Sequence, residues 1–359
     1  MKFFSGLRSK KWIILFGLAF GTLGALAVNW GNPPNMGICV ACFLRDITGA
    51  LGLHRAGVVQ YIRPEVIGFT LGALITALAF REWRPRGGAS PIIRFFLGMF
   101  VMIGALVFLG CPIRMLLRLA GGDLNGLTAL AGLIFGIIVG VFFLKRGFNL
   151  GRAQPASKTA GTIMPLVMVF LLVLAIAAPA FIFQSESGPG SLFMPLGLAL
   201  VIGLFVGFGA QRTRYCSVGA WRDVILVKDF HLVSGIIAFF VAALVTNYIV
   251  GNFGASGIYH WGFENQPISH TDHLWNFLGM GLVGVAATQM GGCPLRNLVL
   301  SGEGDTDAGI TVLGYIFGAA IAHNFAIAAS ASGVNTWSIA AVAIGWVFSI
   351  TIGFTMRKV

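Results

Sequence analysis

A series of apolar runs, each about as long as a bilayer core is thick, constrains this chain more than any other feature. A hydrocarbon core of about 30 Å needs roughly 20 residues of helix to cross it. Because each run is bounded by charged or turn-forming residues, the sequence predicts an all-α polytopic membrane protein with about ten transmembrane helices. The runs are 12–30, 66–80, 95–109, 127–144, 164–183, 192–210, 232–250, 274–291, 310–331 and 337–355.

Four other segments are too short or too charged to cross a bilayer. They are 36–53, 112–120, 215–227 and 294–300. Such segments are stable inside a membrane only where protein surrounds them or a water-filled cavity borders them. We therefore predict four re-entrant half-helices.

The charged residues mark the sides of the membrane. Lys and Arg number 24 against 12 Asp and Glu, and they cluster between the apolar runs. Since short basic loops stay in the cytoplasm, ten crossings with both ends inside fit these clusters. The loops 184–191, 251–271 and 332–335, which lack Lys and Arg, are predicted outside. The basic residues form no interleaved face for nucleic acid. The low share of charged residues and the lack of a phosphate-binding loop exclude an ATPase or a dinucleotide enzyme.

The short segments carry a duplicated motif. Cys-x5-Arg-Asp-x7-His begins at Cys39 and again at Cys216 with identical spacing. The motif Gly-Cys-Pro-[Ile/Leu]-Arg-x7-Gly-Asp begins at Gly110 and again at Gly292. Two copies in the same order indicate an internal duplication. The charged and titratable members of the first motif are Arg45, Asp46, His54, Arg222, Asp223 and His231.

The number of crossings between the copies decides their relative orientation. Four crossings in each half and one apolar run between them make the offset odd, so the halves are predicted to be inverted repeats. The predicted units are residues 1–150 as the first repeat, 151–190 as a linking transmembrane helix, and 191–359 as the second repeat with a final helix. Broken helices of inverted repeats meet near the membrane midplane, where transporters place their substrate sites.

The second motif predicts an anion site. Pro112 and Pro294 are suited to the first position of a helix, which places Cys111 and Cys293 at its cap. The positive end of the helix dipole favours an anion there, and Arg114 and Arg296 follow one turn later. A thiol is a soft, polarizable group and a weak donor, so thiols at these ends point to a soft anion.

Structural roles remain as alternatives for each of these residues. A buried Cys is commonly a small core residue, but a core residue has no reason to recur with Gly, Pro and Arg around it. Cys42 matches Gly219 in the second copy, so for Cys42 both interpretations stay open. Arg45 and Arg222, each followed by an Asp, either contact the substrate or form intramembrane ion pairs that lock the two halves together. His54 and His231 either make interfacial hydrogen bonds or move a proton.

At these motifs the chain resembles the YeeE/YedE family of bacterial sulfur-transport membrane proteins, over nearly its full length. The resemblance implies an hourglass-like inverted repeat in the bacterial inner membrane. It also implies that thiols hand on thiosulfate or a related species by transient S–H···S hydrogen bonds. Carried over by motif, the thiols are Cys39 on the outer side, Cys111 near the middle and Cys293 towards the cytoplasm. The Cys-x2-Cys of Cys39 and Cys42 resembles the selenium-associated YedE-like branch.

The function expected from the sequence is import of a small sulfur- or selenium-containing anion by a transporter that is not an enzyme. We expect no cofactor and no nucleic acid; the expected partners are the anion, the lipid bilayer and a cytosolic sulfur-carrier (TusA-like) protein. Two alternatives remain. One is a membrane thiol oxidoreductase using Cys39 and Cys42, which the single occurrence of Cys111, Cys216 and Cys293 disfavours. The other is a channel for a hard anion, in which the cysteines play no part.

Overall fold

The computed structural model describes residues 9–253 and 257–357, and its secondary structure is almost entirely helical. The helices are α2 (Lys10–Asn29), α3 (Val40–Ala50), α4 (Pro64–Ala79), α5 (Pro91–Phe108), α6 (Pro112–Ala120), α7 (Asn125–Lys145), α8 (Lys158–Ala177), α9 (Leu196–Thr213), α10 (Ser217–Val227), α11 (His231–Ile249), α12 (His273–Met290), α13 (Pro294–Gly302), α14 (Thr306–Asn324), α15 (Thr336–Thr355) and the 3-10 turn η2 (Pro189–Ser191). The two-residue strands β1 (Arg86–Gly87) and β2 (Gln154–Pro155) pair antiparallel.

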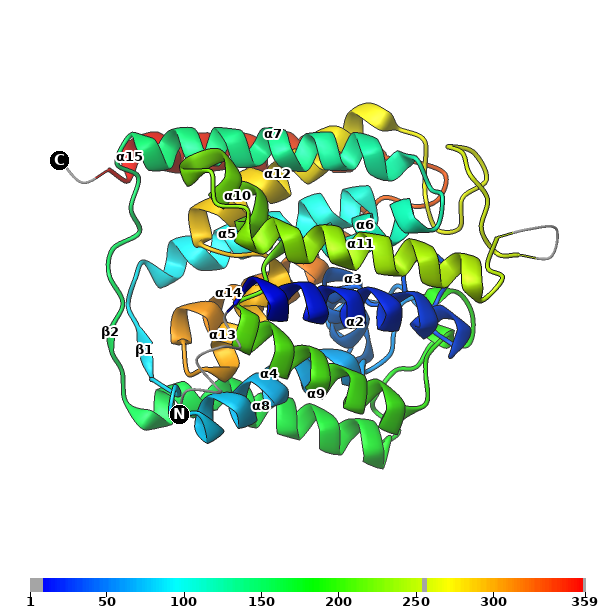
Figure 1. The fold of residues 1–359 in the computed structure, drawn as a ribbon, viewed down its shortest axis with the longest axis horizontal. Coiled ribbons are helices and arrows are strands. Elements are labelled where there is room, and N and C mark those ends of the chain that lie inside the picture. The colour runs from blue at the N-terminus through cyan, green and yellow to red at the C-terminus, as the bar shows by residue number, and fades with distance from the viewer. Residues whose placement is uncertain (1–8, 254–256, 358–359) are drawn as a thin grey trace.

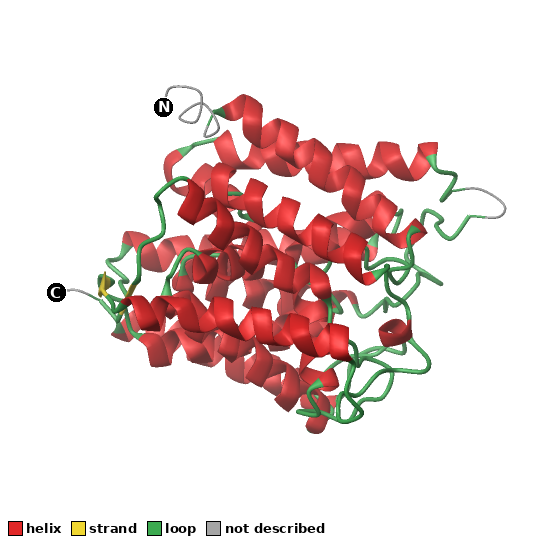
Figure 2. Ribbon diagram, turned by 90° about the horizontal axis from the view of Figure 1, so that it is seen from below, coloured by secondary structure: helices red, strands yellow, loops and turns green. Residues whose placement is uncertain are grey.

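The long helices run roughly parallel to one another in one bundle, with the loops gathered at its two ends (Figures 1 and 2). Each predicted apolar run overlaps one long helix, and each predicted half-helix overlaps one of the short helices α3, α6, α10 and α13. Some ends differ from the prediction. Helix α8 stops at Ala177, before Pro179, and α9 starts after Pro195. Proline causes both differences, because it interrupts helical hydrogen bonding.

Within the described residues, eight helices are long and apolar enough to cross a membrane. Three of them are broken: Pro91–Ala120, Leu196–Val227 and His273–Gly302 each join a long helix to a half-helix. Helix α4 is apolar but has only 16 residues, and α14 is not among the eight. An all-α, multi-pass membrane protein is therefore confirmed, whereas ten crossings remain a prediction. The chain ends, predicted to be cytoplasmic, lie outside the described residues.

Helices of the first half pack against helices of the second half in a repeated pattern. Helix α2 packs on α11 while α4 packs on α9, and α5 packs on α14 while α7 packs on α12. The motifs match α2 with α9, α4 with α11, α5 with α12 and α7 with α14. Under this matching the α2–α11 contact corresponds to the α9–α4 contact, and the α5–α14 contact corresponds to the α12–α7 contact. The half-helices follow the same pattern, since α6 contacts α11 and α13 contacts α4. A twofold axis between the halves would produce this exchange.

Glycines allow these helix pairs to approach closely. A Cβ on Gly136 of α7 would overlap the carbonyl oxygen of Gly281 on α12. The equivalent contact in the other half is between α14 and α5, where a Cβ on Gly314 would overlap the carbonyl oxygen of Phe95. Membrane helices commonly pack through small residues, because lipid provides no hydrophobic drive between them.

Two long helices lie outside the duplicated set. Helix α8 packs on α4, α13 and α14, and α15 packs mainly on α12 and α5. The buried side of α8 is a narrow stripe that includes Met164, Met168 and Leu171, and the rest of the helix exposes large apolar side chains. Such a surface suits a helix that faces lipid on most of its circumference.

Candidate functional site

Three thiols form a buried cluster where two half-helices begin, called here the outer thiol cluster after the side on which the sequence predicts it. Cys39 is the N-cap residue of α3 and Cys111 is the N-cap residue of α6. Their Sγ atoms are 3.7 Å apart, and the Cys39 Sγ also accepts from the backbone N–H of Cys42 at 3.3 Å. All three side chains are buried.

A matching pair, called here the inner thiol pair, lies at the start of the other two half-helices. Cys216 is the N-cap residue of α10 and Cys293 that of α13. The Cys216 Sγ accepts from the N–H of Gly219 at 3.2 Å and from the N–H of Cys293 at 3.4 Å. The predicted capping positions of Cys111 and Cys293 are confirmed. The interpretation of Cys111, Cys216 and Cys293 as isolated thiols is wrong, because the tertiary structure gives each of them a cysteine partner.

Arg114 is the charged group of the outer thiol cluster. Its Nε donates to the Asn35 carbonyl at 2.9 Å, its Nη1 to the Cys42 Sγ at 3.2 Å and its Nη2 to the Ile268 carbonyl at 3.0 Å. The side chain is completely buried. Among the described residues, no carboxylate lies within salt-bridge distance of this guanidinium. Arg114 is thus a buried cation with neutral hydrogen-bond acceptors.

Its counterpart Arg296 has a different partner. The Nη1 of Arg296 lies 3.4 Å from Oε1 of Glu303, and both side chains are partly exposed. The sequence predicts equivalent roles for the two arginines from their identical motifs. In the structure a carboxylate balances only Arg296.

The Arg-Asp pairs of the first motif are local ion pairs. Arg45 Nη2 lies 2.6 Å from its neighbour Asp46, and Arg222 Nη2 lies 2.8 Å from its neighbour Asp223. Pairs between adjacent residues cannot lock the two halves together, so that part of the structural alternative is wrong.

Arg63, which sequence reasoning missed, makes the longer connection. Its guanidinium lies 2.8 Å from Asp46 and also donates to the carbonyls of Pro189 and Leu192, each at 2.9 Å. The available signal was an arginine between the first two predicted crossings. Ten crossings with both ends inside place that segment on the outer side, where basic residues are otherwise rare.

Asp123 and Asp305, from the second motif, form ion pairs with arginines from different parts of the chain. Asp123 Oδ2 lies 2.6 Å from Arg118, on the preceding half-helix, and both side chains are fully buried. Asp305 Oδ2 lies 2.8 Å from Arg86, which belongs to the distant strand β1, and its other oxygen caps α14. Both aspartates fasten the start of the long helix that follows them.

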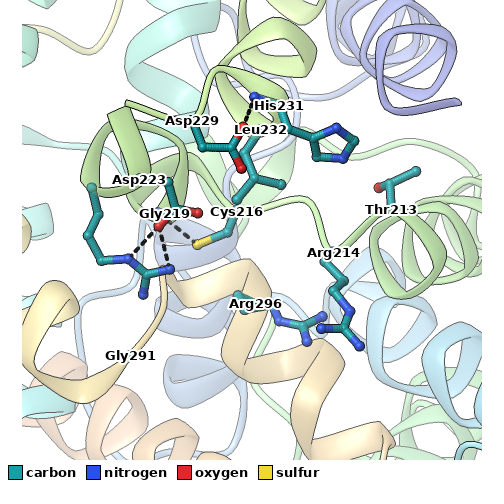
Figure 3. A pocket seen from close by; sticks show the side chains of 11 residues that line it. Thr213, Arg214, Cys216, Gly219, Asp223, Asp229, His231, Leu232, Gly291 and Arg296 are labelled. Carbon is teal, nitrogen blue, oxygen red and sulfur yellow. Dashed lines mark hydrogen bonds and ion pairs between the residues drawn. The ribbon is translucent and has the colours of Figure 1, made fainter. Parts of the chain in front are cut away.

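A cavity of about 420 Å³ opens beside the inner thiol pair. Figure 3 shows Cys216 between Asp223 on one side and the Arg214 and Arg296 side chains on the other. Cys216 lines this cavity, whereas Cys293 does not. The remaining lining residues are Thr213, Gly219, Arg222, Asp229, His231, Leu232 and Gly291.

The outer thiol cluster is covered instead by residues 259–271, called here the outer strap. Asn35 donates its backbone N–H to the Tyr259 hydroxyl at 3.2 Å and its side-chain amide to the Pro267 carbonyl at 3.0 Å. Arg118 donates to the Ser269 hydroxyl. These contacts, with that of Arg114 to Ile268, hold the strap over the thiols.

Two strap residues are buried in their neutral forms. Burial raises the pKa of Tyr259 to about 12. Burial also lowers the pKa of His270, whose Nε2 donates to the Val107 carbonyl at 2.8 Å while Nδ1 accepts from the Asp272 N–H. These two residues therefore add no charge to the outer thiol cluster.

The two motif histidines occupy different surroundings. His54 is buried, with its Nε2 3.0 Å from the Arg45 carbonyl oxygen and its ring 4.6 Å from that of His323. His231 starts α11 and lines the inner cavity. Identical spacing in the sequence did not give them equivalent positions, because the linkers differ in length. The long linker 51–63 separates α3 from α4, whereas only the short linker 228–230 separates α10 from α11.

The comparisons with known proteins bear on this arrangement. A protein-family model described as sulphur transport matches residues 212–357, which include α10, the inner thiol pair and the outer strap. This part of the chain is therefore similar to the sulphur transport family. The resemblance seen in the motifs is thereby confirmed for residues 212–357 at the level of the YeeE/YedE family, whereas the selenium-associated branch stays a prediction. A search of the curated proteins found no match.

Proposed function

We propose that this protein imports a small sulfur- or selenium-containing anion across the bacterial inner membrane, along its cysteine thiols. The observation that carries the proposal is the meeting of half-helix N-termini at each thiol group, with Cys216 of one group lining a cavity that also has arginines in its wall. Helix N-termini favour an anion, and thiols favour a soft atom. The match of residues 212–357 to the sulphur transport family supports the same substrate class.

The proposed path begins at the outer thiol cluster and ends in the inner cavity. Cys39 and Cys111 receive the anion from outside and pass it towards Cys293 and Cys216. Each thiol is both a weak donor and a weak acceptor, so contacts with the anion form and break readily. Arg45 and Arg222, each balanced by the following aspartate, set the potential at the two ends of the path.

The proposed orientation places the inner cavity in the cytoplasm and the two repeats, 1–150 and 191–359, in opposite orientations around the linking segment 151–190. The exchanged helix partners support it, and so do the loops free of Lys and Arg. In a cysteine-free background, single cysteines at Ser187 and Ser157 should label from opposite sides of intact cells, with Ser187 outside. Labelling of both from one side would contradict the inverted arrangement.

The direct experiment is uptake by vesicles that contain only this protein. Radiolabelled thiosulfate, selenite and selenosulfate are compared, and we expect saturable uptake of at least one that is lost in Cys111→Ser and in Cys293→Ser. Serine keeps size and hydrogen bonding but replaces the soft sulfur with a hard oxygen. Normal uptake by both variants would sink the thiol path and leave a hard-anion channel. A cytosolic sulfur-carrier (TusA-like) protein, added inside the vesicles, should raise net uptake if it removes the product.

A membrane thiol oxidoreductase is the second candidate, and the Cys39–Cys111 contact of 3.7 Å favours it. In this function the two thiols form a disulfide and their two electrons and two protons reduce a quinone to a quinol. Quinone reduction by the purified protein, abolished in Cys39→Ser, would support it over transport. Uptake by vesicles without added quinone would argue the other way.

A further inference from the structure

An apolar groove of about 160 Å³ lies between α2 and α9, two helices that pack on each other (Figure 1). Phe16 of α2 is buried at its floor, with its ring 6.2 Å from that of Phe205 on α9. Leu15 of α2 and Phe208 of α9 form the walls and are 52% and 40% exposed. Because α2 is one of the helices able to span a membrane, this groove is open to the lipid and favours a hydrocarbon chain.

One end of the groove is polar. Trp12, in the first turn of α2, and Arg212 and Thr213, at the end of α9, all line it. Thr213 also lines the inner cavity, so this end of the groove adjoins the cavity. Tryptophan is enriched where a membrane meets water, which places this end at the depth of the lipid headgroups. The groove thus has an apolar length and a polar end, as a phospholipid has.

The two basic residues at this end differ in how their charge is balanced. The Nη1 of Arg212 lies 3.0 Å from Oε2 of Glu82. Among the described residues, no carboxylate lies within salt-bridge distance of Lys11. Lys11 lies one turn before Leu15 on the same face of α2, because residues four apart share a helix face. Its long side chain carries the charge towards the headgroups, so the polar end of the groove is positive.

We propose that the groove binds one acyl chain of an anionic phospholipid, such as phosphatidylglycerol, whose phosphate lies against Lys11. Basic sites between membrane helices commonly bind anionic headgroups. The charge at the polar end favours such a lipid over a zwitterionic one with the same chains. This inference concerns the lipid-facing surface of the bundle and is independent of which anion the protein imports.

Quenching of tryptophan fluorescence by brominated lipid tests the site, because Trp12 lines the groove. The protein is reconstituted in phosphatidylcholine vesicles containing an equal, minor fraction of brominated phosphatidylglycerol or brominated phosphatidylcholine, and the difference between wild type and Trp12→Phe gives the signal of Trp12. We expect brominated phosphatidylglycerol to quench Trp12 about fivefold more, the preference that one basic residue gives to an anionic headgroup. Equal quenching by the two lipids would overturn the inference. Quenching by neither would also overturn it and would indicate that a second copy of the chain covers the groove.

Two neighbouring lysines separate a specific site from a general attraction of basic surfaces. Lys11→Gln should reduce the preference for phosphatidylglycerol to less than about twofold. Lys10→Gln is the matched control, since Lys10 lies one turn before Ile13, which faces Gly235 of α11 and not the groove. It should keep most of the preference. Equal losses in the two variants would refute the site.

A third pair of variants tests the chain-binding part without changing any charge. Ala19 lines the groove and Leu18, its exposed neighbour, does not. Ala19→Phe fills the groove and should lower the quenching of Trp12 by brominated phosphatidylglycerol at least about threefold, whereas Leu18→Phe should leave it unchanged. Wild-type quenching in Ala19→Phe would contradict a chain lying in the groove.

The last measurement separates the lipid from a free phosphate. In detergent, phosphatidylglycerol should raise the Tm of the wild type, because a ligand that binds only the folded protein stabilises it. Glycerol 3-phosphate at the same concentration has the phosphate without the chains and should not raise the Tm. An equal rise with both would mean that the site binds a soluble phosphate, and the lipid would be ruled out as its ligand.

Discussion

The outer thiol cluster and the inner thiol pair are built from the same repeated motif, yet one is closed and the other is open. In each, two cysteines cap two half-helices. The outer strap covers the outer cluster, whereas the inner pair adjoins a cavity of about 420 Å³. The difference lies in the connections: the long segment 250–272 joins α11 to α12, whereas the shorter segment 80–90 joins α4 to α5. The repeat supplies the chemistry, and the loops decide access to it.

The largest effect expected from this difference is on stability. Arg63→Met removes one of the two arginine partners of the fully buried Asp46 and leaves Arg45 in place. It should lower the free energy of unfolding by about 1.5–3 kcal/mol. Arg222→Met, in a pair that is partly exposed, should cost less than about 1 kcal/mol. Unfolding of the two purified variants in detergent provides the measurement. Equal losses would mean that the outer half is not the more tightly closed one.

The second-largest expected effect is a difference between Cys216 and Cys39 in their access to reagents. Cys216 lines the inner cavity, whereas Cys39 is enclosed. In protein that keeps one of these two as its only cysteine, a membrane-impermeant maleimide should modify Cys216 at least about tenfold faster, because modification requires exposure of the thiol. Inside-out and right-side-out vesicles show from which side each reaction occurs. Faster labelling of Cys39 from outside would contradict the closed outer cluster.

Function should depend on both thiol groups despite this difference in access. Cys39→Ser and Cys216→Ser should each slow uptake about tenfold, equivalent to about 1.4 kcal/mol in the transition state. Vesicle uptake is normalised to folded protein, and Thr355→Ala, at an exposed position of α15, provides a control. If only the Cys216 variant is impaired, the outer cluster has a structural role and takes no part in transport.

The smallest expected effect is on the strap itself. Tyr259→Phe removes the acceptor of the buried Asn35 N–H, and should raise the labelling rate of a single Cys39 about threefold by favouring the lifted strap. Tyr248→Phe, which alters a hydroxyl that accepts from the exposed Trp261, is the control. Identical rates in the two variants would show that the strap opens independently of this contact.

The sequence predicted the elements of the candidate site better than their partners. Pro112 and Pro294 fixed the starts of α6 and α13 at the predicted residue, because a proline at the first helical position is a local constraint. The pairing of Cys111 with Cys39 escaped prediction, since the two lie far apart in the chain. Arg63 and the strap also escaped it, because neither belongs to the repeat.

The sequence by itself determined the all-α membrane fold, the places where helices break, and the thiols and arginines at those breaks. Hydropathy and proline geometry act over a few helical turns, so they can be read from a local stretch of sequence. The repetition can be read by comparing one segment directly with another. Only the tertiary structure decided that the thiols meet in two groups, that among the described residues a carboxylate balances Arg296 and none balances Arg114, and that the outer cluster is covered while the inner pair is open. Those features depend on which distant loops pack over each half-helix, and packing between distant segments leaves no local pattern in the chain.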